Sequence, residues 1–194
     1  MRDHMIVAVV VMSSAVVVIG FLDLVSDARW FRFPLSAILA YGLSMTLVAI
    51  ASRIVSLSLP HWYIGLRPSE RSQPVYARFG IDLFRRMLAT TGIDACNRLV
   101  RFSGRPGALR DLARGMRKAE TRHAISFLVI LFAIIYSIAK SWYLVAGWLA
   151  LINVLANVYP IALQRHNRTR VQAILDRFRK TRWNGELAPD TRSP

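Results

Sequence analysis

Cysteine, acidic residues and familiar catalytic motifs are all scarce in this sequence. Cys96 is the only cysteine, which excludes an intrachain disulfide and a cysteine-based metal site. Eleven acidic residues stand against 26 Lys and Arg, giving a formal net charge of +15. No P-loop, GxGxxG, HExxH or GxSxG motif occurs, and no His is followed after four residues by Asp. The chain therefore carries no signature of nucleotide binding, of the common hydrolases or of the usual soluble glycerolipid acyltransferases.

The charges are also missing from four long stretches of the chain. Hydrophobic residues make up 54% of the sequence, and the uncharged runs cover residues 5–22, 33–52, 124–139 and 141–164. About 20 helical residues cross the roughly 30 Å hydrocarbon core of a bilayer. These runs predict an all-α integral membrane protein with four transmembrane helices. The last two runs meet at Lys140-Ser141, which predicts a tight turn and a helical hairpin.

The distribution of Lys and Arg predicts the orientation of these helices. Residues 53–123 carry 14 Lys and Arg against five Asp and Glu, and residues 165–194 carry eight against three. Such an excess is typical of cytoplasmic segments. We therefore expect a multi-pass protein of the cell inner (cytoplasmic) membrane with both termini cytoplasmic. The first run is interpreted as a retained span, because it is long and no clear cleavage site follows it.

The long basic loop, residues 53–123, has helical patterning of its own. Apolar residues recur at helical spacing over residues 74–90, which predicts an amphipathic interfacial helix. A Gly-rich break at 103–107 precedes a second such pattern that continues into the third span. We interpret residues 1–183 as a single membrane domain and residues 184–194 as a disordered tail. Anionic lipids are the expected partners of the basic residues, and no nucleic-acid partner is expected.

Glu120 and His123 form the first candidate site. Their i, i+3 spacing places them on one helix face, within an otherwise apolar stripe. An ionisable residue facing the interior of a membrane bundle favours a functional role. His123 is the candidate general base, with Glu120 orienting its ring. The alternative is structural: Glu120 pairs with Arg117 or an arginine of the C-terminal segment, and His123 marks the interface.

The end of the fourth span is the second candidate site. Asn153, Asn157 and Gln164 recur at steps of four and seven, and Pro160 leaves the Ala156 carbonyl without its helical donor. Hydrogen bonding between helices is the structural alternative for these amides. The polar residues that crowd the following segment are candidates for binding phosphate or carboxylate groups, or are topology markers: Arg165, Asn167, Arg168 and Arg170, together with His166. The four histidines lack ligand spacing, so no metal is expected.

These motifs resemble the glycosyl-4,4'-diaponeurosporenoate acyltransferase family. The resemblance rests on AETRH at residues 119–123, the hydrophobic hairpin, and NVYPIALQRHNRTR at 157–170. LPHWY at 59–63 and YARFG at 76–80 add to it. The likeness spans roughly residues 55–180 and departs from the family's pattern over residues 88–107.

The resemblance implies a membrane acyltransferase. It would move a fatty acyl group from a thioester donor, acyl-CoA or acyl carrier protein, to a sugar hydroxyl of a glycosylated carotenoid or similar membrane glycolipid. His123 and Glu120 would be catalytic, and Asn157 and Gln164 would contact the sugar or the acyl carbonyl. The basic segment 165–170 would face the donor, and no cofactor is implied. A non-catalytic membrane carrier or assembly subunit, docking an acidic partner through the basic loop, is the alternative.

Overall fold

The computed structural model describes residues 2–29, 31–66, 80–90 and 106–186. Within these ranges every regular element is a helix, which confirms the predicted all-α class. Four helices are long and apolar enough to cross a membrane, as predicted. The elements are α1 (Arg2–Leu24), α2 (Pro34–Ile54), α3 (His61–Ile64), α6 (Ile81–Thr90), α7 (Pro106–Ala139), α8 (Tyr143–Asn153), the π-helix η2 (Val154–Val158) and α9 (Tyr159–Glu186).

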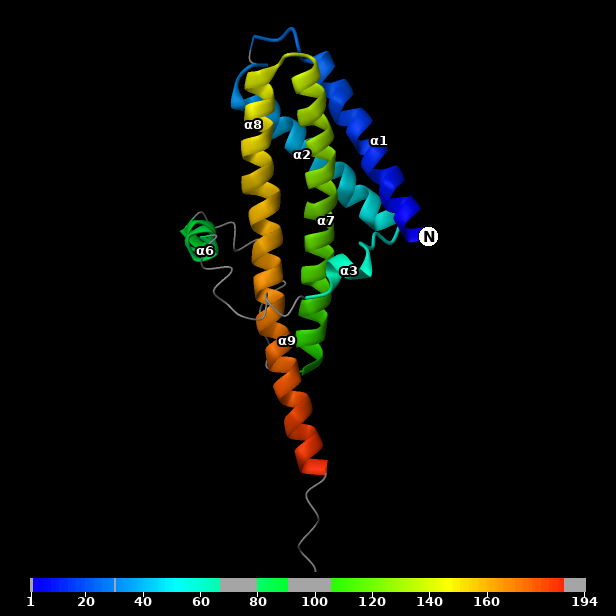
Figure 1. Cartoon of the computed structure of the whole chain (residues 1–194), viewed down its shortest axis with the longest axis vertical. Helices are drawn as coiled ribbons and strands as arrows, with labels where there is room; N and C mark the ends of the chain where they lie inside the picture. Colours follow the sequence, from blue (N-terminus) through cyan, green and yellow to red (C-terminus); the bar gives the residue numbers. More distant parts are fainter. Residues whose placement is uncertain (1, 30, 67–79, 91–105, 187–194) are drawn as a thin grey trace, which may run out of the picture. The chain divides into compact units, whose positions relative to one another are not determined.

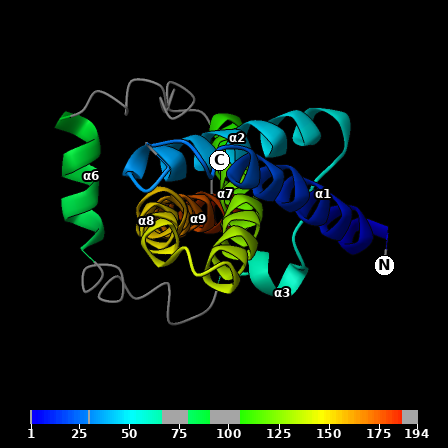
Figure 2. The ribbon, with the colours of Figure 1, turned by 90° about the horizontal axis from the view of Figure 1, so that it is seen from above.

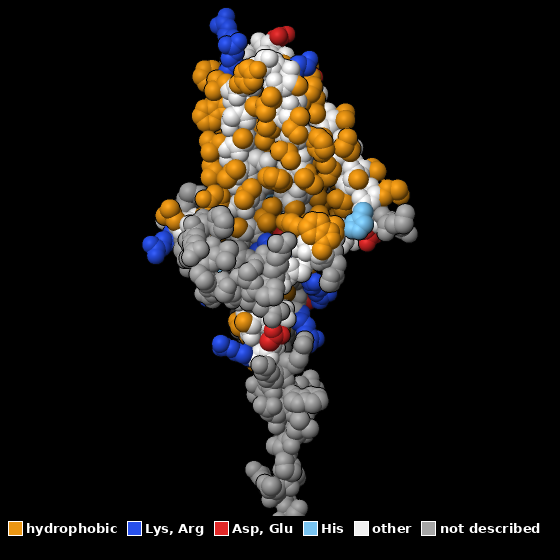
Figure 3. Space-filling view, in the orientation of Figure 1, with side chains coloured by type: hydrophobic (Ala, Val, Ile, Leu, Met, Phe, Trp, Pro, Cys, Tyr) orange, Lys and Arg blue, Asp and Glu red, His pale blue; other side chains and the backbone are white. Residues whose placement is uncertain are grey.

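The chain divides into two compact units. The first contains residues 1–65 and 117–164, and the second contains residues 66–116 and 165–194. Helices α7 and α9 contribute to both units. The four uncharged runs all lie in the first unit, where hydrophobic side chains cover most of the face visible in Figure 3. Large apolar side chains that are exposed along α1, such as Met5, Val9 and Val16, suit contact with lipid.

In the first unit, α7 and α8 lie side by side as an antiparallel hairpin (Figures 1 and 2). The turn between them is a Schellman motif: the Trp142 N–H donates to the Ser137 carbonyl and the Ser141 N–H donates to that of Ile138. Ser141 takes the left-handed conformation, with φ of 60°, that this motif needs at the residue after the helix end. The predicted tight turn at Lys140-Ser141 is confirmed.

Small side chains let α2 pack closely inside the first unit. Ala37, Ala40 and Ser44 recur at three- and four-residue steps and are fully buried. Small residues allow the close helix approach on which packing in membranes depends. The Ser44 hydroxyl hydrogen-bonds the Ser126 hydroxyl of α7 at 2.9 Å, deep in the core. Helix α2 is therefore joined to the hairpin by a polar contact between two small side chains.

The fourth span changes its helical pitch immediately before Pro160. Residues Val154–Val158 form a π-helical turn, and the Tyr159 N–H bonds back to the Val154 carbonyl. Proline has no N–H to donate and its ring crowds the preceding turn, so the backbone widens there. Such π-helical turns often occur at functional sites.

The second unit has its own small core. Leu109 and Met116 of α7 pack against Val171 of α9, and they are all buried. Helix α7 begins at Pro106, inside the predicted Gly-rich break of residues 103–107. Helix α6 covers the C-terminal part of the predicted amphipathic segment 74–90, whereas residues 74–79 lie outside the described residues. Helix α9 continues to Glu186, and the rest of the predicted tail, residues 187–194, also lies outside them.

Candidate active site

A chain of polar side chains links the third and fourth spans inside the first unit. The His123 Nδ1 atom lies 3.2 Å from the Asn157 Oδ1 atom. Asn157 Nδ2 donates to Asn153 Oδ1 at 2.8 Å, and Asn153 Nδ2 donates to the Phe127 carbonyl at 3.3 Å. Asn157 is fully buried and Asn153 nearly so. The predicted stacking of these two amides on one face is confirmed.

The donor and acceptor roles along this series of hydrogen bonds determine the tautomer of His123. Asn153 donates to a carbonyl, so its Oδ1 atom is left to accept from Asn157. Asn157 therefore presents its own Oδ1 atom to the imidazole, and Nδ1 carries the hydrogen that fills this bond. In the neutral ring the lone pair then lies on Nε2. The network thus orients a histidine whose Nε2 can accept a proton.

The backbone next to Asn157 adds a second anchor for this site. Without a donor at Pro160, the Ala156 carbonyl accepts the Tyr41 hydroxyl of α2 at 3.2 Å. The same carbonyl lies beside the His123 ring. Three spans therefore meet at the widened turn: α2 through Tyr41, α7 through His123 and the fourth span through Asn157.

Glu120 and Gln164 also belong to the first unit. Glu120 is only 2% exposed and has a partner in the structure, one turn before His123 on α7. Its burial agrees with an inward-facing stripe. Residue spacing predicted that Glu120 orients the His123 ring, and the structure shows the Nδ1 atom of that ring in contact with Asn157. Gln164 is half-buried near the start of α9. Their roles in catalysis and substrate contact stay predictions.

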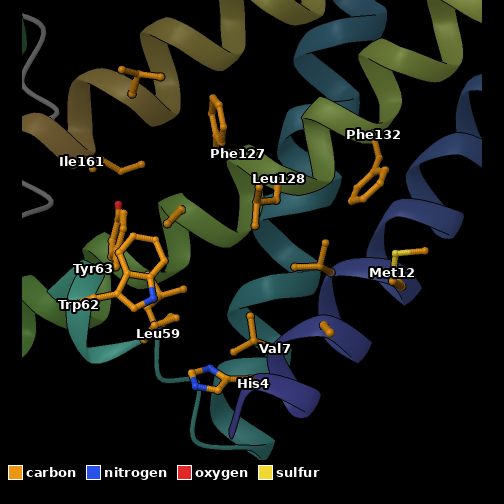
Figure 4. Close-up of a pocket in the computed structure, with 15 residues that line it drawn as sticks. His4, Val7, Met12, Leu59, Trp62, Tyr63, Phe127, Leu128, Phe132 and Ile161 are labelled. Carbon is orange, nitrogen blue, oxygen red and sulfur yellow. The ribbon is translucent and has the colours of Figure 1, made fainter. Parts of the chain in front are cut away.

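An apolar cavity of about 790 Å³ adjoins the polar chain in the first unit (Figure 4). Its lining includes Ala124 and Val158, the residues that directly follow His123 and Asn157. In Figure 4, Phe127, Leu128 and Phe132 project from α7 toward this space, and Trp62 and Tyr63 of α3 lie together at its side. The remaining walls come from α1, α3 and Ile161. A cavity of this size, apolar apart from a few polar groups at its border, is typical of ligand sites.

The predicted donor-binding residues belong to the second unit. Arg168 is 8% exposed and has a partner in the structure, whereas Arg170 is exposed. Arg165 and Asn167 are half-buried, and Arg165 has a partner as well. Arg170 is therefore the member of this set whose charge is most open to a ligand. Donor binding by these residues stays a prediction.

Sequence reasoning missed Tyr41. The residue is separated from its partner Ala156 by 115 positions, and it stands in a span that otherwise resembles a simple anchor. One signal was available: Tyr41 and Ser44 are polar, three residues apart and near the middle of the run. Such a pair faces a neighbouring helix more readily than lipid.

The fold and the site define a helical membrane protein that keeps a histidine–amide chain beside an apolar cavity. The chain belongs to the glycosyl-4,4'-diaponeurosporenoate acyltransferase family, whose model matches residues 60–177. It is thus a member of a family of acyltransferases of carotenoid glycoside biosynthesis, as the resemblance implied. The match contains His123, Asn153 and Asn157 and excludes α1 and α2. No curated protein and no solved structure matches the chain.

Proposed function

We propose that this protein transfers a fatty acyl group from a thioester donor to a sugar hydroxyl of a glycosylated carotenoid or similar membrane glycolipid. The observation that carries the proposal is the oriented imidazole of His123, held by Asn157 and Asn153. Ala124 and Val158, the residues that follow His123 and Asn157, line an apolar cavity. Acyl transfer to a hydroxyl needs a general base at the polar end of a lipid substrate, and this arrangement supplies one.

The chemistry requires one base and no protein nucleophile. Nε2 of His123 accepts the proton of the sugar hydroxyl as the oxygen attacks the thioester carbonyl carbon. When the tetrahedral intermediate collapses, the C–S bond breaks and the leaving thiolate accepts that proton from the imidazolium. The Asn157 Oδ1 atom accepts the Nδ1 hydrogen throughout and holds the ring in place. In this proposal Glu120, which is buried one turn away, stabilises the transient imidazolium charge.

The apolar cavity suits the hydrocarbon part of a substrate. Its lining residues come almost entirely from aliphatic and aromatic types, and it lies among the spans. A polyene or an acyl chain in this space would bring its polar end to Ala124 and Val158, and so to His123 and Asn157. The cavity therefore supports an acceptor or donor with a long apolar chain over a soluble sugar.

The basic segments suit a donor that carries negative charge. Acyl-CoA and acyl carrier protein are both anionic, and Arg170 offers an exposed cation in the segment that follows Gln164. Donors of this kind are cytoplasmic, which agrees with the predicted cytoplasmic side of the loop and of both termini in the inner membrane.

The test is acyl transfer by His123 variants. Membranes containing the protein would be given an acyl thioester and a glucosylated carotenoid acid, and the ester product would be measured by mass spectrometry. We expect His123→Ala and His123→Gln to lose activity by about 10²–10⁴-fold. Gln retains a donor for Asn157 but is no base. Thr46→Ala, which removes an exposed hydroxyl bonded only within α2, is the control. Full activity in His123→Gln would disprove the proposed base.

The identity of the acceptor needs a separate measurement. Lipid extracts of cells that contain the active protein would be compared with extracts of cells that contain His123→Gln. An acylated carotenoid glycoside found only with the active protein would support the proposal. A different acylated lipid would support acyl transfer but would show that the acceptor is not a carotenoid glycoside. Identical extracts would favour the non-catalytic carrier or assembly subunit.

A further inference from the structure

A second, smaller cavity in the first unit is lined by cations. Its volume is about 280 Å³, and it lies between the C-terminal end of α2 with the residues that follow and one face of α7. Its lining residues are Ser52, Arg53, Ile54, Val55, Ser56, Leu57, Lys118, Thr121 and Arg122. Three of the nine carry positive charge and none is acidic. This cavity is separate from the apolar one, with which it shares no lining residue.

The cations of this cavity are not neutralised by acidic side chains in the described part of the chain. Among the residues that the structure describes, Arg53, Lys118 and Arg122 form no salt bridge. The Nε atom of Arg122 is buried without a hydrogen-bond acceptor. A buried donor with no acceptor is costly. An anion with several acceptor oxygens in this space would satisfy that donor and attract the exposed charges of Arg53 and Lys118.

Helix geometry explains how α7 presents these groups. Lys118, Thr121 and Arg122 are related by steps of three and four residues, so they share one face of the helix. Glu120 lies on a different face and does not line the cavity. The Thr121 hydroxyl adds a neutral donor between the two cations. The set therefore combines guanidinium, ammonium and hydroxyl donors, which is the chemistry that recognises phosphate.

The position of the cavity along the spans limits the class of ligand that it could bind. Arg53 stands in the last turn of α2, and Arg122 stands two residues before the uncharged run that begins at Ala124. Both residues border the apolar parts of their helices, where the phosphates of a bilayer lie. We propose that the cavity of Arg53, Lys118 and Arg122 binds the phosphate group of an amphiphile. Two sources carry that group: an anionic phospholipid headgroup and the coenzyme A part of a thioester.

The test is direct binding to the purified full chain in neutral detergent. The probes are short-chain phosphatidylglycerol, short-chain phosphatidylcholine as the zwitterionic lipid, and coenzyme A. We expect Lys118→Gln/Arg122→Gln to lower the affinity for an anionic probe about 10- to 100-fold, because two charged hydrogen-bond donors are lost. The matched control is Arg110→Gln/Arg117→Gln, which removes two exposed cations of the same helix outside the cavity.

Each result has a stated meaning. Loss of phosphatidylglycerol binding alone supports a lipid headgroup, loss of coenzyme A binding alone supports the donor, and loss of both supports a shared phosphate site. An equal loss in the control variant, or no preference for anionic probes in the wild-type chain, overturns the proposal. If the double variant does not fold, Arg53→Gln on α2 provides the same comparison. Because binding is measured without acyl transfer, this result is independent of His123 and of the proposed reaction.

Discussion

The two ends of the first unit differ in how they treat their polar groups. At the hairpin turn, the Tyr136 hydroxyl donates to the Asp23 carboxylate at 2.7 Å, and the Lys140 ammonium lies 5.5 Å from the centre of the Tyr136 ring. Trp142 packs edge-on against Phe31 and Tyr136. At the other end, a polar chain ends on an imidazole nitrogen, and three cations around one cavity have no salt bridge within the described residues.

We propose that this difference separates a structural end from a functional end. Aromatic side chains with paired polar groups anchor helix ends at a membrane interface. Polar groups that are held in place without a partner for their charge or hydrogen bond add nothing to stability by themselves. Such groups are typical of sites that bind a ligand or react. Substitutions at the hairpin turn should therefore alter stability with little effect on activity. Substitutions at the other end should do the reverse.

The largest effect beyond His123 itself is expected at Asn157. Asn157→Leu keeps the approximate volume but removes the acceptor for the Nδ1 hydrogen, so the imidazole loses its orientation and its tautomer control. We expect acyl transfer to fall about 10²-fold or more. The measurement is product formation in membranes with matched amounts of protein. Activity within twofold of wild type would show that this contact does not orient the base.

Asn153 offers a graded comparison with Asn157. Asn153→Ala leaves the His123 contact in place but removes the acceptor for Asn157 Nδ2, so the amide of Asn157 is free to turn. We expect a fall in activity of about tenfold, smaller than for Asn157→Leu, because one link separates Asn153 from the ring. An equal or larger loss of activity in Asn153→Ala would mean that these hydrogen bonds mainly stabilise the fold of the fourth span and do not mainly orient His123.

The sequence predicted the helices well because their signals are local. Uncharged runs define the spans, α7 begins at Pro106 within the 103–107 break, and the hairpin turn follows from Lys140-Ser141. It also placed Asn157 and His123 among the candidate site residues, and the structure brings these two side chains into contact. The partner of the imidazole could not be derived, since Asn157 is 34 positions away and Glu120 is only three. Local spacing favoured the nearer residue, and packing of α7 against the fourth span brought in the amide.

A substitution at the hairpin turn should lower stability and leave activity unchanged, which is the opposite of what we expect at the candidate site. Tyr136→Phe removes the hydroxyl that donates to Asp23 and keeps the ring beneath Lys140 and against Trp142. We expect the free energy of unfolding in detergent to fall by about 0.5–1 kcal/mol, since this bond is exposed to solvent. Acyl transfer by the folded protein should stay unchanged. A fall in activity without a loss of stability would contradict the assignment of the hairpin turn as the structural end.

Among the residues of the candidate site, Tyr41 is expected to have the smallest effect on activity, because it contacts the site and is assigned no chemical role in it. Tyr41→Phe removes the donor to the Ala156 carbonyl and leaves the aromatic ring in place. That carbonyl also lies beside His123, so the loss should loosen the widened turn without removing the base or its amide partner. We expect activity to fall about two- to fivefold, as befits one neutral hydrogen bond of about 0.5–1 kcal/mol.

The double variant Tyr41→Phe/Pro160→Ala tests this explanation for Tyr41. The alanine that replaces Pro160 would supply a backbone N–H that can bond the Ala156 carbonyl within the helix, so the carbonyl would no longer depend on Tyr41. If Tyr41 acts only by satisfying this acceptor, Tyr41→Phe should cost less activity in the Pro160→Ala background than in the wild-type chain. Additive losses would instead place the Tyr41 hydroxyl in contact with substrate, and would extend the functional end to α2, outside the segment that the family model matches.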